Sequence, residues 1–366
     1  MFSICKNLIG SKNNLVVFDD DSIKWSDTYN RDFLIISKEK EACDYLRLYN
    51  IDVNSVFDRK YVDSMKHFKL ENIPWRYIIP RNEWFSSVKT FLENIKFELK
   101  NKYLEFFLVT NLSIKNYYKP NVLNLQKLKD SSIKLKNFLE KHSSEDLRYN
   151  RSSHKTGRLT VTSGPNYLTL EKKYKKLLMP SQKEYLISID LISLEPRVLM
   201  LSQNKSPLKD VYLSIINDLG LPKEDRSKVK IYTLASMYSK DFSLAGNSLK
   251  SKLVKYFSLP MFKEKLIKGI SDKQIFNFFG RPISVNDKEI NNVINYYIQS
   301  TAADVSLWCF SEIVRNYEIL PTCIIHDEII CEVDQKTYNL ICENDFIEVP
   351  NLGKFYYSVE IINKKV

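Results

Sequence analysis

The scarcity of glycine limits what this chain can fold into, because only 8 of its 366 residues are glycine. The count excludes collagen-like and glycine-rich low-complexity chains. Neither G-x-G-x-x-G nor G-x-x-x-x-G-K-[ST] occurs, so both common glycine-rich phosphate turns are missing. If the protein handles phosphates, side-chain cations must therefore do most of that work.

Basic residues exceed acidic ones along the chain. Lysine and arginine number 55 against 44 aspartates and glutamates, a formal net charge of +11. This excess is compatible with a polyanionic partner, because cations that neutralise phosphates release counterions. A solvated lysine-rich surface explains it equally well, so charge alone leaves both interpretations open.

The cysteines and histidines follow no metal or disulfide pattern. None of the 6 cysteines forms a C-x-x-C, and no set with the 4 histidines has zinc-finger spacing, which is typical of reduced cytosolic thiols. Residues 1–20 contain acids, no arginine and no long apolar run, which argues against a signal or transit peptide. No stretch approaches ~18 uninterrupted apolar residues, so we expect no membrane span. The expected location is the cytoplasm, in a bacterial or phage-infected cell.

The first part of the chain predicts a small unit followed by a helical arm. Residues 1–80 are predicted to form an α/β unit, because Leu15–Phe18 and Phe33–Ile36 look like short strands. From residue 82 to about 142, apolar residues recur at helical spacing among lysines and glutamates. A second charged helix is predicted from about Val122 to Lys141, joined to the first by a polar loop.

A loop-rich boundary and several helices are predicted in the rest of the chain. Residues 145–164 shift in composition to Ser, Thr, Arg and Gly. Pro222 suits the first turn of a helix, and the two acids that follow suit its positive end, which predicts a helix over 222–238. Further helices are predicted over 248–257, 261–268 and 288–316.

Two predicted strand ends carry carboxylates. Tyr185–Asp190 reads as a buried strand that ends in an acid, and Cys323–Ile325 and Ile329–Val333 predict a hairpin with Asp327 and Glu328 at its tip. Hard cations prefer oxygen ligands, and two Mg²⁺ ions ~4 Å apart stabilise both oxygens of a phosphoryl displacement. Taken alone, each group of acids reads equally as ordinary solvated turn residues.

One predicted helix carries a ladder of side chains at spacing four. Arg226, Lys230, Leu234 and Tyr238 project from one face, because each step of four residues drifts by only ~40°. The two cations suit a triphosphate, and the aromatic ring can stack on a base or sugar. The alternative is an amphipathic helix with Leu and Tyr in the core and solvated cations.

Two further segments carry polar groups suited to nucleic acid. One is residues 154–159 followed by 164–166. The other begins with Asn295 and Gln299, one helical turn apart, which can hydrogen-bond base or sugar edges. Small residues at 300–303 allow another element to approach closely. A helix cap and a tight helix crossing are the corresponding structural alternatives.

The order of these segments resembles the polymerase region of family-A (DNA polymerase I type) DNA polymerases. The resemblance covers about residues 150–335. The six matching segments are Asp190–Arg197 (D-Y-S-Q-I-E-L-R), Arg226–Tyr238 (R-x3-K-x7-Y-G), Ile325–Glu328 (V-H-D-E), Thr156–Leu159 with Pro165–Asn166 (T-G-R-L…P-N), Phe279–Arg281 (F-G-R) and Ile298–Asp304 (V-Q-G-T-A-A-D).

The resemblance implies an α+β fold of the right-hand polymerase type, with a palm of antiparallel sheet and helices and with helical fingers and thumb. The expected parts are the small α/β unit 1–80, the thumb 81–149, the palm 150–204 and 286–366, and the fingers 205–285 with the helix 222–239. Residues before 82 are too few for the proofreading exonuclease that often precedes this polymerase, which implies a compact form. Asp19 and Asp21 read as a solvated strand end, since no D-x-E occurs before residue 82.

The resemblance also assigns catalytic and nucleotide-binding roles. Asp190 and Asp327 would bind two Mg²⁺ ions, for which Mn²⁺ can substitute, and Glu328 would assist at the primer end. Arg226 and Lys230 would hold the triphosphate, with Lys230 adding positive charge where catalysis needs it. The remaining nucleotide-binding positions would be Tyr238 at the nascent base pair, Leu234 beside it, and Glu195, which would exclude a 2′-hydroxyl.

The DNA-binding positions follow from the same matches. They are Arg158, Asn166, Arg281, Asn295, Gln299 and His326. The chain departs from the family at several places. Leu234 replaces an aromatic residue, Ser239 a glycine and Ile324 a glutamine, and residues 191–193 differ from Y-S-Q. The short stretch between the first two motifs predicts reduced fingers.

The sequence therefore predicts a template-directed DNA polymerase that lacks proofreading. Its expected partners are primer–template DNA and deoxynucleoside triphosphates, and residues 1–80 are a candidate docking site for a replication partner. A single-subunit RNA polymerase is one alternative, against which Glu195 argues. An inactive nucleic-acid-binding relative is another, against which the complete set of metal carboxylates argues.

Overall fold

The chain divides into two compact units, Met1–Leu108 and Val109–Val366. The computed structural model describes residues 2–4, 15–19, 22–26, 34–35, 67–68, 80–83, 86, 90, 121–122, 133–144, 146–151, 154–239, 242, 248–271 and 273–365. The predicted division into thumb, palm and fingers, with a separate unit at 1–80, stays a prediction.

The described part of the first unit is a four-stranded sheet in the order β3-β2-β1-β4. Its strands are β1 (Phe2–Ile4), β2 (Leu15–Asp19), β3 (Ser22–Ser26) and β4 (Leu34–Ile35). β1 is antiparallel to β2 and parallel to β4. The two predicted strands are confirmed, and Asp19 is the last residue of β2. Asp21 lies outside the described residues.

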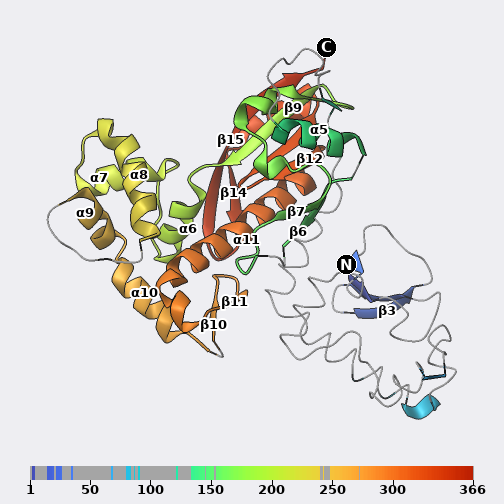
Figure 1. Ribbon diagram of the computed structural model, residues 1–366, viewed down its shortest axis with the longest axis horizontal. Coiled ribbons are helices and arrows are strands. Elements are labelled where there is room, and N and C mark those ends of the chain that lie inside the picture. The colour runs from blue at the N-terminus through green and yellow to red at the C-terminus, as the bar shows by residue number, and fades with distance from the viewer. Residues whose placement is uncertain are drawn as a thin grey trace. The chain divides into compact units, whose positions relative to one another are not determined.

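A five-stranded antiparallel sheet is the centre of the second unit (Figure 1), in the order β12-β13-β9-β15-β14. The strands are β9 (Tyr185–Leu191), β12 (Leu320–Ile325), β13 (Glu328–Val333), β14 (Phe346–Val349) and β15 (Gly353–Lys364). β9 is the middle strand, as expected for a short, almost continuous apolar run. The predicted strand over 185–190 and the predicted hairpin before residue 334 are confirmed.

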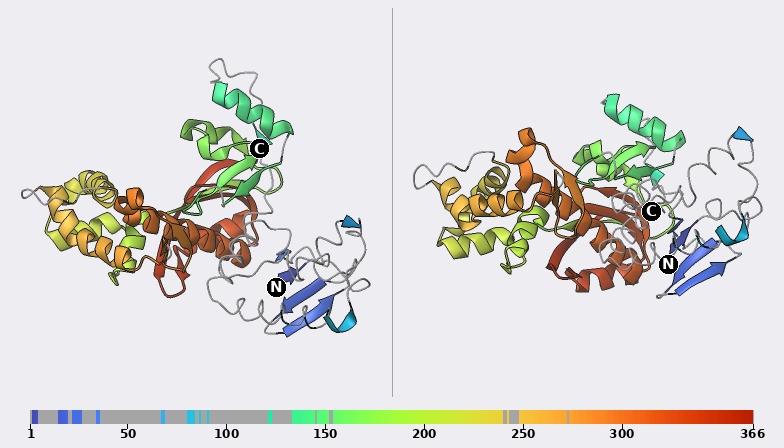
Figure 2. Two further views of the ribbon diagram at one scale, coloured as in Figure 1. Left: turned by 60° about the horizontal axis from the view of Figure 1, so that its bottom comes forward. Right: turned by 90° about the horizontal axis from the view of Figure 1, so that it is seen from below.

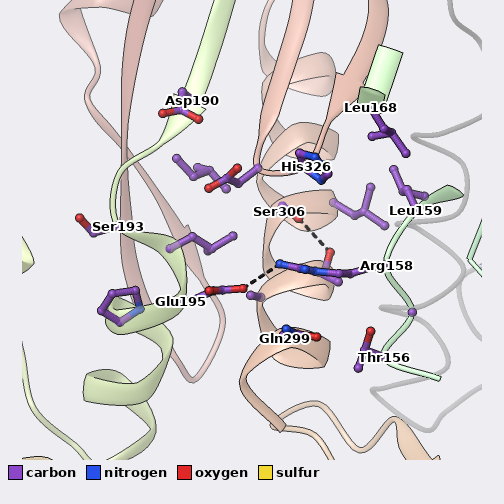
Figure 3. A pocket seen from close by; sticks show the side chains of 18 of the residues that line it. Thr156, Arg158, Leu159, Leu168, Asp190, Ser193, Glu195, Gln299, Ser306 and His326 are labelled. Carbon is purple, nitrogen blue, oxygen red and sulfur yellow. Dashed lines mark hydrogen bonds and ion pairs between the residues drawn. The ribbon is translucent and has the colours of Figure 1, made fainter. Parts of the chain in front are cut away.

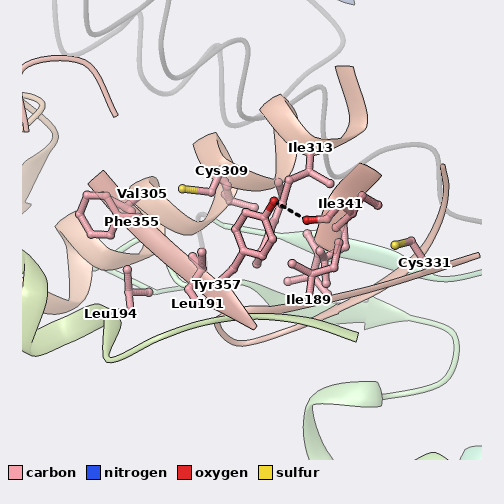
Figure 4. Packing of buried hydrophobic residues seen from close by; sticks show 14 of the residues in the cluster. Ile189, Leu191, Leu194, Val305, Cys309, Ile313, Cys331, Ile341, Phe355 and Tyr357 are labelled. Atoms are coloured by element: carbon pink, nitrogen blue, oxygen red, sulfur yellow. Dashed lines mark hydrogen bonds between the residues drawn. The ribbon is translucent and has the colours of Figure 1, made fainter. Parts of the chain in front are cut away.

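One face of this sheet is covered by helices α11 (Val293–Asn316) and α12 (Gln335–Glu343). Ile189 and Leu191 of β9 point into this layer and are fully buried with residues of α11 (Figure 4). The Tyr357 hydroxyl of β15 donates to the Ile341 carbonyl oxygen at 3.1 Å, which ties sheet and helix together. Burial of each large apolar side chain contributes about 1.5–3 kcal/mol, so this layer is a major source of stability for the second unit.

Helix α5 (Ile133–Ser144) packs on the other face, as the two views of Figure 2 show. Leu186 belongs to this second cluster with Phe138, because neighbouring residues of a strand point to opposite faces. The same alternation places Ser188 and Asp190 on the α5 face. Ser188 is buried there, whereas the Asp190 side chain is exposed at the end of the strand.

Short elements connect α5 to β9. They are β5 (Asn121–Val122), β6 (Arg148–Asn150), β7 (Thr160–Ser163), η5 (Tyr167–Thr169), η6 (Lys172–Leu177) and β8 (Leu178–Met179). The predicted helix, from about Val122, is wrong for Val122 itself, because β5 pairs with β8 and a strand satisfies the backbone there. Residues 123–132 lie outside the described residues. The later part of that helix is confirmed as α5. Most of the first predicted helix of the arm lies outside the described residues.

Helices gather at one end of α11 (Figure 1). They are α6 (Leu194–Ser202), α7 (Val211–Leu219), η7 (Lys223–Asp225), α8 (Arg226–Met237), α9 (Leu249–Tyr256), α10 (Leu259–Lys268) and η8 (Asp287–Asn292), with the hairpin β10 (Gln274–Phe276) and β11 (Pro282–Ser284). Their core includes the fully buried Ile215, Val229 and Phe257. The predicted helices over 222–238, 248–257, 261–268 and 288–316 are confirmed, apart from short 3₁₀ turns at two starts.

No helix in the described ranges is long and apolar enough to cross a membrane.

Candidate active site

The two predicted metal-binding aspartates lie beside each other at one end of the central sheet. Asp190 is near the end of β9, and Asp327 lies in the two-residue turn between β12 and β13. Pairing of β13 with β9 places Glu328 opposite Asp190, and the Leu191 amide donates to the Asp327 carbonyl oxygen at 3.0 Å. His326 adopts a positive φ of 58°, as tight hairpin turns require. Strand pairing and turn geometry therefore bring the acids together.

The electrostatic surroundings of these carboxylates favour a bound cation. Although the tip of Asp190 is exposed, the protein around the rest of the carboxyl partly desolvates it. This desolvation, followed by the charges of Asp327 and Glu328, raises the pKa of Asp190 to about 7, while Lys175 and Lys172 act in the opposite direction. Burial is also the main reason that the pKa of Asp327 is raised. Within the described part of the chain, neither carboxylate forms an ion pair. A cation between them would relieve the cost of keeping both ionised.

The available ligands fit Mg²⁺ better than they fit a metal ion that needs all of its ligands from the protein. The described residues contain no group of three or more His, Cys, Asp or Glu placed to hold a metal ion. Mg²⁺ is commonly bound through one or two carboxylates, with water and substrate phosphates supplying the other ligands. Asp190 and Asp327 are such a pair.

Glu328 differs from the prediction that it stands at the hairpin tip. It is the first residue of β13, and its side chain is buried. Its carboxylate accepts hydrogen bonds from the Ser188 hydroxyl at 2.5 Å and from the Lys175 ammonium. Lys175 is not among the site residues predicted from the sequence. The basic run in η6 was the available signal, but its partner comes from a distant strand.

A cavity of about 740 Å³ opens beside the aspartates. Figure 3 shows Asp190 and His326 at one part of it and Glu195 joined to Arg158 at another. The predicted site residues that line the cavity are Asp190, Asp327, Glu195, Lys230, Leu234, Arg158, Gln299 and His326. Five separate segments of the chain thus contribute predicted residues to one cavity.

Glu195 is held by donors from two other segments. Its carboxylate accepts a hydrogen bond from Arg158 Nη2 at 2.7 Å and another from the Tyr238 hydroxyl. Burial, followed by the charge of Glu195 and this hydrogen bond, raises the pKa of Tyr238. Tyr238 therefore remains a hydroxyl donor, and Glu195 is fixed at the cavity wall.

Other predicted residues lie outside the cavity wall. Arg226 is paired with Asp210, and Arg281 is paired with Asp304. Asn166 is exposed near α5 and lines a separate small pocket. The Asn295 Oδ1 atom is buried and accepts no hydrogen bond from the described residues. The DNA-binding roles of Asn166, Arg281 and Asn295 stay predictions.

A buried ion-pair network joins three elements beneath the cavity. Asp304 of α11 is completely buried and pairs with the guanidinium groups of Arg151 and Arg281. Asn277 Nδ2 also donates to it at 2.7 Å. Gly157 packs against this network with φ of 70°, and a Cβ there would lie 2.8 Å from Arg281 Cζ. Asp304 ends the motif match Ile298–Asp304, but its structural role could not be predicted from that match.

No protein-family model matches the chain, and no curated protein is detectably similar to it in sequence. Among solved structures, the chain is similar to the POL domain of Pol1 from M. smegmatis, determined in complex with DNA primer-template and dNTP. The identity is 16%, and the TM-score is 0.49. The similarity covers 63% of this chain, which spans about half (50%) of the length of the matched chain.

Proposed function

We propose that this protein is a template-directed DNA polymerase that adds deoxynucleotides to a primer 3′ end. The observation that carries the proposal is the pair Asp190 and Asp327, which meet in a cavity that Lys230 also lines. Neither aspartate has an ion-pair partner in the described ranges, and each has a raised pKa. This combination suits phosphoryl transfer, which needs a cation site beside a group that receives negative charge.

Asp190 and Asp327 would hold Mg²⁺, and Mn²⁺ is an expected substitute. When bound, such ions neutralise charge on the attacking and leaving oxygens of nucleotidyl transfer. Lys175 would keep Glu328 engaged next to this pair, because it neutralises the third acid. Lys172 would add a second positive charge near Asp190. Its charge already acts to lower the pKa of that carboxyl.

The opposite wall of the cavity would receive the nucleotide and the primer terminus. Lys230 projects from α8 into the cavity and would contact the triphosphate. Leu234, one turn further, would give the base an apolar surface. Arg158, Gln299 and His326 also line the cavity and would donate hydrogen bonds to the primer–template. Each of these roles is implied by the resemblance of the motifs, and the position of the side chain on the wall is compatible with it.

We propose deoxynucleotides as substrates because Glu195 lines the cavity, where its carboxylate would exclude a 2′-hydroxyl. Arg158 and Tyr238 both donate hydrogen bonds to this carboxylate and orient it at the wall. This argues against an RNA polymerase, the main alternative within enzymes. We further propose that residues 1–81 do not remove a mismatched 3′ end, since they contain no D-x-E.

The test is primer extension by the full chain with Mg²⁺, using either deoxynucleotides or ribonucleotides. We expect extension with deoxynucleotides, and a loss of at least about a thousandfold for Asp327→Asn, as for removal of a group central to charge stabilisation. Binding of primer–template should persist in this variant. Asp334→Asn is the matched control, because Asp334 caps α12 away from the cavity. Full activity of Asp327→Asn would contradict the proposal, and binding without extension by the wild type would favour the inactive relative.

A further inference from the structure

Arg226 and Lys230 belong to one face of α8 but have different surroundings. Lys230 lines the cavity, and no ion pair to it is found among the described residues. Arg226 lies one turn earlier and does not line the cavity. Its Nε donates to Asp210 Oδ2 at 2.6 Å, and its guanidinium lies 5.5 Å from the centre of the Tyr212 ring. The N-terminus of α7 therefore holds Arg226.

The two oxygens of Asp210 have separate tasks. Oδ1 caps α7 by accepting the Tyr212 amide at 2.9 Å and the Leu213 amide at 3.3 Å, while Oδ2 receives Arg226. The preceding backbone is anchored by Arg197, whose Nη2 donates to the Lys209 carbonyl oxygen at 2.6 Å. Arg197 is itself 1% exposed. The buried contacts of Arg197 with the neighbouring backbone therefore fix the position of Asp210.

The ion pair itself is accessible to solvent. The side chain of Arg226 is 45% exposed and that of Asp210 is 26% exposed. Exposed ion pairs contribute little to stability and exchange partners readily. A triphosphate carries more negative charge than one carboxylate and binds a guanidinium through two parallel hydrogen bonds. It is therefore a stronger partner for Arg226 than Asp210.

We propose that Asp210 is a positioning residue that holds Arg226 away from the cavity until the triphosphate of an incoming nucleotide takes it over. This inference rests on the proposed polymerase function. Because the Arg226–Asp210 pair must break before Arg226 binds phosphate, Asp210 weakens nucleotide binding. It thereby sets the affinity for the nucleotide without contacting it.

The test is Asp210→Asn in the full chain, because asparagine caps a helix as well as aspartate but carries no charge. We expect the KM for deoxynucleotides to fall about two- to fivefold with little change in kcat, the range that an exposed ion pair allows. The dissociation constant of a deoxynucleotide on a dideoxy-terminated primer–template should fall by the same factor. Asp334→Asn removes a similar capping carboxylate near Lys183 and should leave both constants unchanged.

A double-mutant cycle separates the effect of the Arg226–Asp210 pair from that of a general change in charge. In an Arg226→Gln background, Asp210→Asn should no longer alter nucleotide affinity, because the pair is already absent. An unchanged or higher KM in Asp210→Asn would overturn the inference, as would an equal fall in the Arg226→Gln background. Failure of the wild type to extend a primer would instead overturn the polymerase function, while the equilibrium binding measurement still decides the role of Asp210.

Discussion

At the scale of single residues, the site depends on which partner each charged side chain finds. Glu195 is bound by Arg158 and Tyr238, and Glu328 by Lys175 and Ser188. Asp190 and Asp327 have no such ion-pair partner among the described residues. Two of these acids are thus neutralised by neighbouring side chains, and the other two are the ones proposed above to hold Mg²⁺.

Replacing Glu195 should relax the choice of sugar. In Glu195→Ala, the carboxylate that would exclude a 2′-hydroxyl is removed. We therefore expect the preference for deoxynucleotides over ribonucleotides to fall at least about tenfold, the usual contribution of one small group to substrate discrimination. The measurement is the ratio of kcat/KM values for the two nucleotide classes. An unchanged ratio would remove Glu195 from sugar selection.

Tyr238→Phe is the graded control for that experiment. It removes the hydroxyl that donates to Glu195 but keeps the aromatic ring, while Arg158 still holds the carboxylate. The sugar preference should therefore change in the same direction as in Glu195→Ala, but less. A larger effect than that of Glu195→Ala would mean that the tyrosine hydroxyl, and not the carboxylate, excludes the 2′-hydroxyl.

At the scale of secondary-structure elements, α11 joins the two groups of packed elements in the second unit. Its residues enter both the core beside the sheet and the core of the helical cluster. Asp304, near its middle, also binds Arg151 after β6 and Arg281 at β11. Gln299 lies on the same helix and faces the cavity. Displacement of α11 would therefore disturb the cavity wall.

Breaking the Asp304 network should destabilise the protein strongly. Asp304→Asn leaves two guanidinium groups without their buried carboxylate, so we expect the free energy of unfolding to fall by about 3–5 kcal/mol at pH 7. Chemical denaturation followed by circular dichroism measures this loss. Asp287→Asn, at an exposed aspartate of η8, is the matched control and should change little.

The difference in unfolding free energy between the wild type and Asp304→Asn should depend on pH, and the sign of this dependence can be predicted. Burial favours the protonated form of Asp304, but Arg281 and Arg151 lower its pKa overall. A lowered pKa in the folded state gives stability above the unfolded value of about 3.9, and this stability is lost as the pH falls through the folded pKa. The difference between wild type and Asp304→Asn should thus shrink below about pH 4. A constant difference would contradict the assignment.

At the scale of the whole molecule, the net charge of +11 predicts salt-sensitive DNA binding. Between 50 and 200 mM salt, the affinity for primer–template should fall by about tenfold or more, because each phosphate contact releases counterions. Fluorescence anisotropy at several salt concentrations measures the slope of log affinity against log salt. Affinity that does not depend on salt would contradict binding through phosphates.

Two lysine variants test whether the salt dependence comes from a particular part of the surface. Lys172 lies in η6 and influences the pKa of Asp190, whereas Lys354 is an exposed lysine of β15. Lys172→Gln should reduce the steepness of the salt dependence by about 1 if it contacts a phosphate. Lys354→Gln makes the same change in charge and should leave the slope unaltered. Equal effects would indicate that only net charge matters.

Much of the second unit could be predicted from the sequence because its signals are local. The apolar run of β9, the interrupted apolar run of the β12–β13 hairpin and the helical spacing of α8 all depend on neighbouring residues. The start of the helix predicted at Val122 failed for the same reason. Its pairing partner, Leu178–Met179, is distant in sequence and overrides the local helical pattern.

The sequence by itself determined the order and type of most elements and the side chains available to a site. Only the tertiary structure decided how these side chains are paired. It brings Asp190 beside Asp327, gives Glu328 to Lys175, and turns Arg226 toward Asp210. The physical reason is that periodicity and turn chemistry act over a few residues, whereas the partner of a charged group depends on which distant segments packing brings within hydrogen-bond distance.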